Sequence, residues 1–222
     1  AAVTSASAVE MANPLPAGVK AVQIGISAST YFVLGSDGKV YVCGTNASGG
    51  AGQNSTTAVL GWTTMRDTTG VAGTSLTNVQ FISAQNSTSG GFGDSVAMIL
   101  KDGSVLGAGS NSRFLLGIPT GSVDMMVNYY SKILIPTLSA GSVVGKPAYA
   151  VEVGGHFSSV LLYGCAGLIN GTGHNPGGAF GDGTTGDRSE FAETLFLGNL
   201  AEACVAPAVI ASSALTGLCD DR

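Results

Sequence analysis

Charged residues are scarce in this chain of 222 residues. Asp, Glu, Lys and Arg together make up 10% of the sequence, against roughly 25% in a typical soluble domain. Long amphipathic helices need a charged outer face, so this scarcity argues against a helical protein. Gly is abundant instead, with 34 residues, which is about twice its usual share. Together with many Ser, Thr and Asn residues, this composition predicts an all-β protein with many tight turns.

The chain also lacks a basic cluster. Its nine Lys and Arg residues lie singly between Lys20 and Arg222, and the formal net charge is −5. Nucleic-acid binding requires several cations on one face, and anionic membrane surfaces attract polybasic segments for the same reason. No apolar run approaches the ~20 residues of a membrane span. The sequence therefore predicts no nucleic-acid partner and no membrane insertion.

Residues that form common catalytic and metal sites are few. There are two histidines, His156 and His174, and four cysteines without a CxxC spacing, so a zinc site is not expected. Neither a Gly-x-Ser-x-Gly elbow nor a P-loop is present. Asp182 and Asp187 miss the spacing of a calcium loop. We expect no catalytic residues, no metal and no cofactor, and free buried cysteines in preference to disulfides.

The sequence contains a repeat that recurs at offsets of 65 and 64 residues. Residues 31–46, 96–111 and 160–175 align without a gap. In each copy two apolar runs are joined by a tight turn containing Gly, a pattern typical of a β-hairpin. The runs do not alternate between apolar and polar residues, which indicates strands buried on both faces. Sheets stacked face to face around an axis bury their strands in this way.

A further short strand is predicted before each hairpin, at 22–24, 79–81 and 151–153. The predicted organisation is an N-terminal extension at 1–20 followed by repeats at 21–77, 78–147 and 148–200, with a partial fourth at 201–222. A rival hypothesis makes 200–218 an Ala-rich helix. Pro207 and the β-branched pair Val209-Ile210 argue against that helix.

Three segments carry a resemblance to a known family. They are GDGTTGDRS at 181–189, GGHFS at 154–158 and NASGGAG at 46–52, and their pattern resembles the propeller repeat of the regulator-of-chromosome-condensation family. The resemblance runs from about Ala21 to the end and implies a β-propeller. The chain departs from the family before each Gly-x-Asn turn, where Cys43, Ala108 and Thr172 replace an aromatic residue, and only the third repeat keeps the family's His, as His156.

Three repeats and a part are too few for a closed ring of this family. The expected fold is therefore an incomplete β-propeller, completed by further sequence, by another chain or by strands from residues 1–20. Such a chain would expose an apolar blade face and unpaired strand edges. We expect it to be an oligomer or part of a longer chain.

Propellers bind partners through variable loops on their rims. The variable segments here contain residue types enriched at binding hot spots, and the candidate partner-binding residues are Trp62, Arg113, Phe114, Tyr129 and Tyr130. The first hypothesis is a non-catalytic module of a phage tail fibre, virion or adhesin, located extracellularly or on a virion surface and recognising a protein or glycan. The family resemblance implies an alternative, an intracellular regulator that promotes nucleotide exchange on a small GTPase. A third hypothesis is an enzyme acting at a rim.

Overall fold

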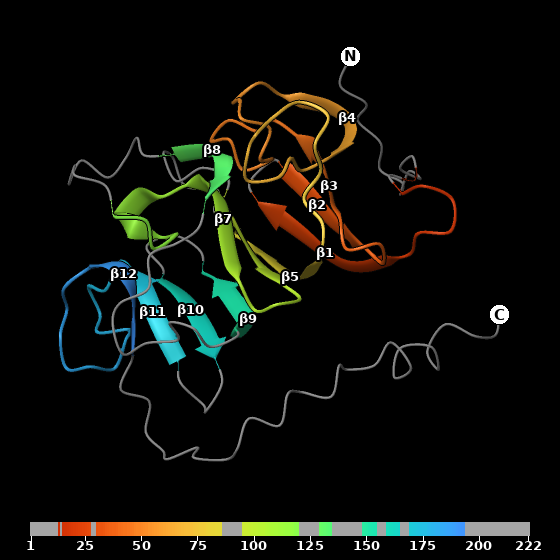
Figure 1. Ribbon diagram of the computed structural model, residues 1–222. Helices are drawn as coiled ribbons and strands as arrows, with labels where there is room; N and C mark the ends of the chain where they lie inside the picture. The colour runs from red at the N-terminus through yellow and green to blue at the C-terminus, as the bar shows by residue number, and fades with distance from the viewer. Residues whose placement is uncertain are drawn as a thin grey trace, which may run out of the picture.

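The computed structural model describes residues 13, 15–27, 30–85, 95–119, 129–134, 148–154, 159–164 and 169–193. The regular elements in these ranges are β-strands and one 3-10 turn (Figure 1). No helix in these ranges is long and apolar enough to span a membrane. In chain order the elements are β1 (Ala21–Ser27), β2 (Thr30–Gly35), β3 (Val40–Gly44), β4 (Val59–Thr64), β5 (Val79–Ala84), β6 (Ser95–Leu100), β7 (Val105–Ser110), η1 (Ser112–Phe114), β8 (Tyr129–Leu134), β9 (Ala148–Val153), β10 (Ser159–Gly164), β11 (Ile169–Gly173) and β12 (Arg188–Glu193).

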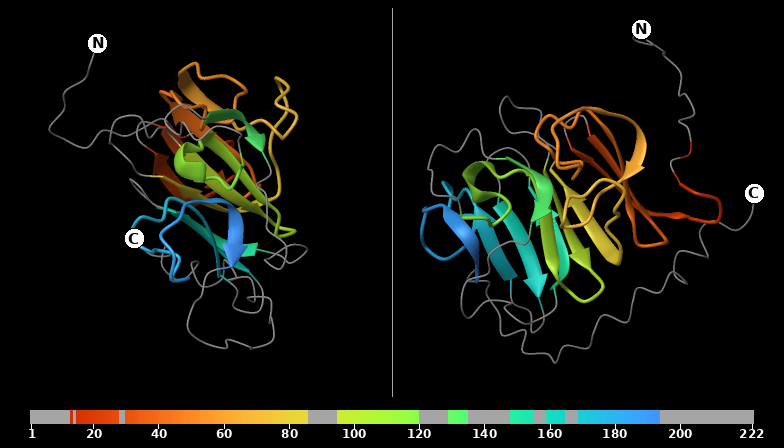
Figure 2. Two further views of the ribbon diagram at one scale, coloured as in Figure 1. Left: turned by 90° about the vertical axis from the view of Figure 1, so that its left-hand side faces the viewer. Right: turned by 45° about the horizontal axis from the view of Figure 1, so that its top comes forward.

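The strands form three antiparallel sheets of four strands, each ordered as in the sequence. We call β1–β4 blade one, β5–β8 blade two and β9–β12 blade three. The first strands β1, β5 and β9 lie next to one another, and the blades fan out from them (Figure 2). This confirms the predicted all-β fold of propeller blades. The exact limits predicted for each repeat stay predictions, and the predicted partial fourth blade at 201–222 lies outside the described residues.

The three central hairpins share one register. Thr30 pairs with Gly44, Ser95 with Gly109 and Ser159 with Gly173. These pairs are separated by the same offsets as the sequence repeat. The backbone pairing therefore repeats along the chain together with the sequence.

The turns of the first two hairpins also hold the next blade. The carbonyl of Gly38 accepts a hydrogen bond from the backbone N–H of Val79 at 2.9 Å, and the carbonyl of Gly103 accepts one from Ala148 at 3.0 Å. Gly38 has a φ of +74°, and a Cβ there would lie 3.2 Å from the backbone nitrogen of Asn78. Gly38 is thus required both for the turn conformation and for the close approach of the next blade.

The apolar core lies between the blades, with one cluster on each face of blade two. On β6, Val96 and Met98 belong to the cluster shared with blade one, whereas Ala97 and Ile99 belong to the cluster shared with blade three. Both faces of the strand are therefore buried, which explains the absence of apolar and polar alternation in the sequence. The second cluster is completed by Val105, Leu115, Ala148, Val151, Val153 and Phe191.

Candidate functional site

After its third strand, each described blade makes a turn organised by a buried asparagine. We call residues 46–52, 111–117 and 175–181 the first, second and third Asn turns. In each one the asparagine Oδ1 accepts a hydrogen bond from the backbone N–H five residues later, at 2.9, 2.8 and 3.2 Å. The side-chain amide donates to a carbonyl further along, at Ser55, Ile118 and Thr184. This bonding explains why the sequence repeats Asn at these positions.

The second Asn turn differs from the other two at its fourth residue. The first and third turns have Gly49 and Gly178 there, with φ values of +78° and +70°. The second has Phe114 with a φ of +61°, preceded by Arg113 with a φ of +57°. The left-handed conformation costs a residue with a side chain about 1–2 kcal/mol. Strained backbone of this kind is concentrated at binding and active sites, so this pair marks the second turn as a candidate site.

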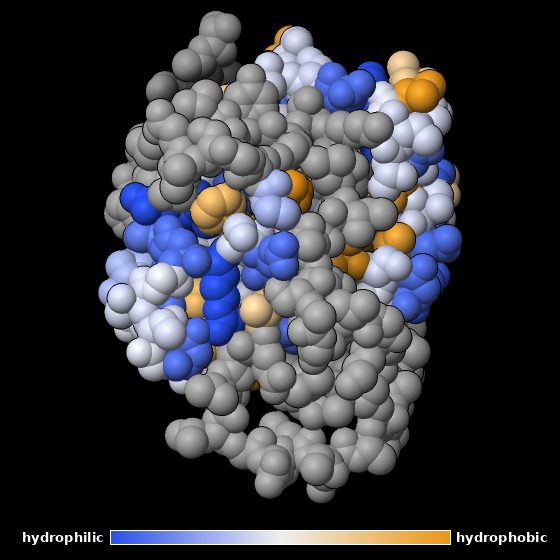
Figure 3. Space-filling view, turned by 60° about the vertical axis from the view of Figure 1, so that its left-hand side comes forward, coloured by the Kyte–Doolittle hydropathy of each residue, from blue (hydrophilic) through white to orange (hydrophobic). Residues whose placement is uncertain are grey.

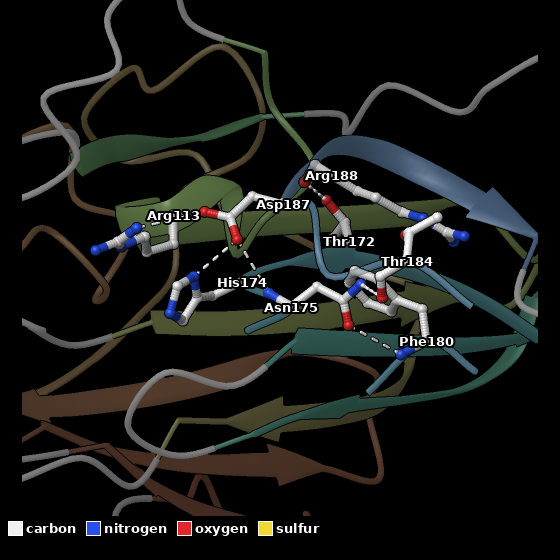
Figure 4. Close-up of polar contacts among 8 residues, drawn as sticks. All are labelled: Arg113, Thr172, His174, Asn175, Phe180, Thr184, Asp187 and Arg188. Atoms are coloured by element: carbon white, nitrogen blue, oxygen red, sulfur yellow. Dashed lines mark hydrogen bonds and ion pairs between the residues drawn. The ribbon is translucent and has the colours of Figure 1, made fainter. Parts of the chain in front are cut away.

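Blade three holds the strained turn in place. The hydroxyl of Thr172 on β11 lies 3.0 Å from the carbonyl oxygen of Phe114 and 2.9 Å from that of Arg188. Arg113 Nη1 lies 3.5 Å from Asp187 Oδ2, as Figure 4 shows. Thr172 stands where the family pattern has an aromatic residue, and its hydroxyl bonds to a turn of the neighbouring blade. These contacts join blades two and three at their rim.

Asp187 is the shared acceptor of this region. Its Oδ1 accepts hydrogen bonds from the backbone N–H of Asn175 at 3.0 Å and lies 2.7 Å from His174 Nδ1. We call Arg113, Phe114, His174 and Asp187 the blade 2–3 rim. His174 is mostly buried there, while a third of the Arg113 side chain is exposed. Figure 3, in which the side of the molecule bearing β12 comes forward, shows hydrophilic residues gathered around a few apolar ones.

Asp182 belongs to a separate pair. Its carboxylate lies 2.5 Å from Arg188 Nη2, and the Arg188 guanidinium lies 4.5 Å from the centre of the buried Phe180 ring, a cation–π arrangement. Hydrogen bonds from the backbone and hydroxyl of Thr184, with a further contribution from Arg188, lower the pKa of Asp182 to about 2. Among the described residues, no three His, Cys, Asp or Glu side chains converge as a metal site would require.

The structure places the five predicted partner-binding residues in two blades. Arg113 and Phe114 are adjacent in η1. Tyr129 and Tyr130 begin β8, and their backbone pairs with Ser110 and Gly109, directly before the second Asn turn; their side chains lie outside the described part. Trp62 is half-buried on β4 in blade one. Partner binding by these five residues stays a prediction, and His156 lies outside the described residues.

Sequence reasoning did not identify Thr172 or Asp187 as parts of this rim. In the sequence Asp187 stands out as a candidate cation ligand and as part of the motif at 181–189, and Thr172 stands out as a departure from the family. The signal for the site was Phe114 in place of Gly within the repeated turn pattern. A comparison of the three aligned turns, position by position, would have shown it.

Comparisons with known proteins agree with this architecture. No protein-family model and no curated protein matches the sequence. By structure the chain is similar to human WBSCR16, with a TM-score of 0.58 and 17% identity over 79% of this chain and 38% of that chain. It is also similar to Prp20p from Saccharomyces cerevisiae, described by its binding to Gsp1p and histones, with a TM-score of 0.54 and 15% identity over 80% and 39% of the two chains.

Yeast RCC1 (Prp20) bound to Kap60 gives a TM-score of 0.53 and 16% identity, over 80% of this chain and 37% of that one. The fold is therefore RCC1-like, and the chain spans about two fifths of the length of these structures. The prediction of an extracellular or virion-surface location is wrong by this comparison. These neighbours are RCC1-like proteins that include a partner of histones and Gsp1p, and none of the three is a tail fibre or adhesin.

Proposed function

We propose that this chain is a non-catalytic, protein-binding part of an RCC1-like propeller and that it contacts its partner through the blade 2–3 rim. The observation that carries the proposal is the Arg113–Phe114 pair. Both residues are held in the left-handed conformation at positions where the other two turns have Ser48-Gly49 and Gly177-Gly178. Nothing in the turn's own hydrogen bonding needs an Arg or a Phe, because the other turns form the same bonds without them.

The chemistry of the pair suits a protein surface. Arg and aromatic side chains dominate binding energy at protein interfaces, and a guanidinium presents a planar set of donors to carboxylates and carbonyls. Arg113 is a third exposed and Phe114 is half-buried. Asp187 and Thr172 fix the backbone and guanidinium beforehand, which reduces the entropy lost on binding.

A small GTPase is the partner class that we propose. The repeat motifs resemble those of the regulator-of-chromosome-condensation family, and one structural neighbour is described by its binding to Gsp1p. This support favours a regulator of a GTPase over the tail-fibre or adhesin module that composition suggested. It also favours a protein partner over a glycan.

The test measures binding and nucleotide release with a panel of purified small GTPases. We expect at least one to bind the wild-type chain and to release its nucleotide faster in its presence. Arg113→Ser and Phe114→Gly, which restore residue types found in the other turns, should weaken that binding at least tenfold, corresponding to about 1.4 kcal/mol. The matched control is Ser48→Ala in the first Asn turn, which should leave the affinity unchanged.

Each result is decisive for one part of the proposal. Binding that is unaffected by both rim variants would overturn the rim as the contact surface. A panel in which no GTPase binds would overturn the partner class. Phe114→Gly removes backbone strain, so a folded Phe114→Gly protein that fails to bind cannot be explained by a damaged turn.

A further inference from the structure

A buried pair of serines lies directly before the strained residues of the second Asn turn. Ser112 precedes Arg113 and is 4% exposed, and Ser110 ends β7 and is 3% exposed. The Ser110 Oγ accepts a hydrogen bond from the backbone N–H of Ser112 at 3.3 Å and lies 3.0 Å from the Ser112 Oγ. Two contacts therefore restrict the backbone of Ser112 at the point where the chain enters the left-handed conformation.

The other two Asn turns cannot form this pair of contacts. The position of Ser112 is occupied by Ala47 in the first turn, which has no hydroxyl, and by Pro176 in the third, which has no backbone N–H. These turns have Gly49 and Gly178 at the left-handed position, where glycine incurs no steric cost. The serine pair is thus found in the described turn that places a side chain at that position.

The residue before each repeated asparagine differs between the first two turns. Thr45 of the first turn is exposed, whereas Ser110 of the second is buried. A buried hydroxyl costs free energy unless it is hydrogen-bonded. The contacts with Ser112 therefore explain how the Ser110 hydroxyl is accommodated in the interior.

Ser110 is itself anchored to its own blade and to blade one. Its carbonyl oxygen accepts a hydrogen bond from the Ser95 Oγ at 2.8 Å, and the backbone N–H of Ser95 donates to the Ser27 Oγ of β1 at 3.0 Å. Ser27 and Ser95 are completely buried. Hydrogen-bonded serines therefore connect blade one to the residue that precedes Arg113, in addition to the contact that Thr172 makes from blade three.

We propose that Ser110 and Ser112 are positioning residues, which hold Arg113 and Phe114 in the left-handed conformation that presents them to a protein partner. Residues with side chains persist in this conformation only where the surrounding structure enforces it. A turn that is ordered before binding loses less entropy when the partner binds. The role towards a partner rests on the function proposed above, whereas the role in the turn can be measured on the free chain.

The first measurement is NMR of the free chain. A residue with a positive φ gives a strong NOE between its own amide and α protons, and we expect this signal for Arg113 and Phe114 in the wild type. Ser110→Ala removes the acceptor of the Ser112 N–H and should weaken the signal at both residues. Ser112→Ala keeps that hydrogen bond and should have a smaller effect. Ser110→Thr keeps the hydroxyl and should retain the wild-type signal.

The matched control is Ser83→Ala. Ser83 is a buried serine of β5 whose hydroxyl accepts a hydrogen bond from the N–H of Val153 in blade three at 3.0 Å. This variant loses a buried hydroxyl outside the second Asn turn and should leave the signals of Arg113 and Phe114 unchanged.

The second measurement is the affinity for a GTPase that binds the wild-type chain. Ser110→Ala should weaken this binding about fivefold, corresponding to about 1 kcal/mol. Ser110→Thr and Ser83→Ala should bind as the wild type does, because both keep the hydroxyl that restrains Ser112.

Unchanged NMR signals in Ser110→Ala and Ser112→Ala would overturn the positioning role, and so would equal changes in Ser83→Ala. Should Ser110→Ala fail to fold, Ser112→Ala decides the same question. A variant whose turn changes without any change in the affinity for a bound GTPase would overturn the blade 2–3 rim as the contact surface and leave the role of the serines in the turn established.

Discussion

Blades one and two have the same backbone register but different surroundings. Ile24 and Ile82 occupy equivalent positions on their first strands, yet Ile24 is 71% exposed and Ile82 only 2%. The repeat therefore specifies that a position is apolar, while the neighbouring blade decides whether that residue stabilises the fold or is left as surface. A blade of this kind is complete only when another blade packs on it.

The two blades differ a second time in their Asn turns. Both turns are closed by the same hydrogen bonds of Asn46 and Asn111. Blade one places Gly49 at the left-handed position, where it costs little, and blade two places Phe114 there. In blade two the carbonyl of the strained Phe114 accepts a hydrogen bond from Thr172 of the next blade, whereas in blade one Ala51 of the turn packs in the apolar cluster shared with the next blade. Shared bonding keeps the turn the same while its exposed residues vary.

The largest difference in the free energy of unfolding is expected between the two variants that truncate the equivalent isoleucines. Ile82→Ala should lower the free energy of unfolding by about 2–5 kcal/mol, because it leaves a cavity in the core between the blades. Ile24→Ala should cost less than about 1 kcal/mol at low protein concentration, where the exposed side chain loses little burial. Chemical denaturation of both variants measures the difference. Equal losses would show that the two environments are not distinct.

A smaller effect is expected at Asn170, which extends the comparison to blade three. Asn170 is fully buried, and its side-chain nitrogen and oxygen find no hydrogen-bond partner among the described residues. The equivalent residue of blade two is the buried Leu106. Asn170→Leu should raise the free energy of unfolding by about 1–3 kcal/mol, because it removes unsatisfied polar groups.

The matched control for that variant is Asn175→Leu. Asn175 is equally buried, but its side chain bonds to Phe180 and Thr184, so this change should destabilise the protein. Denaturant titrations of the two variants should move in opposite directions. A loss of stability in both would mean that Asn170 makes a favourable contact.

The next effect concerns backbone strain in the Asn turns. Gly49→Ala should cost about 1–2 kcal/mol, because Ala is strained at a φ of +78°. Phe114→Gly should change stability by less, because relief of the same strain is offset by the lost contacts of a half-buried ring. Thermal unfolding of the two variants tests this. A large loss of stability in Phe114→Gly would show that the ring contributes to packing more than to binding.

The smallest effect is the pH dependence that Asp182 adds to blade three. The equivalent residues of blades one and two, Gln53 and Ile118, are uncharged. The pKa of Asp182 is about 2 in the folded protein, below the ~3.9 of an unfolded chain. Its stabilising effect is therefore present above the unfolded pKa and lost as the pH falls towards 2.

Thermal midpoints of wild type and Asp182→Asn, measured from near neutral pH downwards, test this dependence. The wild type should have the higher midpoint above the unfolded pKa, and the two curves should meet as the pH approaches 2. A difference that stays constant over the whole range would assign the effect to packing, without a role for ionisation.

Much of the fold could be predicted from the sequence because it depends on local patterns. The Gly turn at 38 and 103, the apolar runs and the repeated Asn each act within a few residues, so the hairpins could be located from the sequence. The candidate site was predicted only in part. Arg113 and Phe114 were selected by residue type, whereas Thr172 and Asp187 were missed because they reach the second Asn turn from 58 and 74 residues away.

Location was the wrong prediction, and it failed for a related reason. Low charge and abundant Gly, Ser and Thr describe the turns and buried faces of stacked sheets as well as they describe an exposed fibre. Composition therefore indicates the type of secondary structure and carries little information about where a protein acts. The correction rests on the structural similarity to RCC1-like proteins.

By itself the sequence determined the repeating unit, since turn formation by Gly and Asn and the pairing of adjacent apolar runs are short-range effects. Tertiary structure alone decided which of the repeated apolar residues are buried, because burial depends on a neighbouring blade. It also decided that Phe114 is held in a strained turn by Thr172, since only folding brings those two residues together.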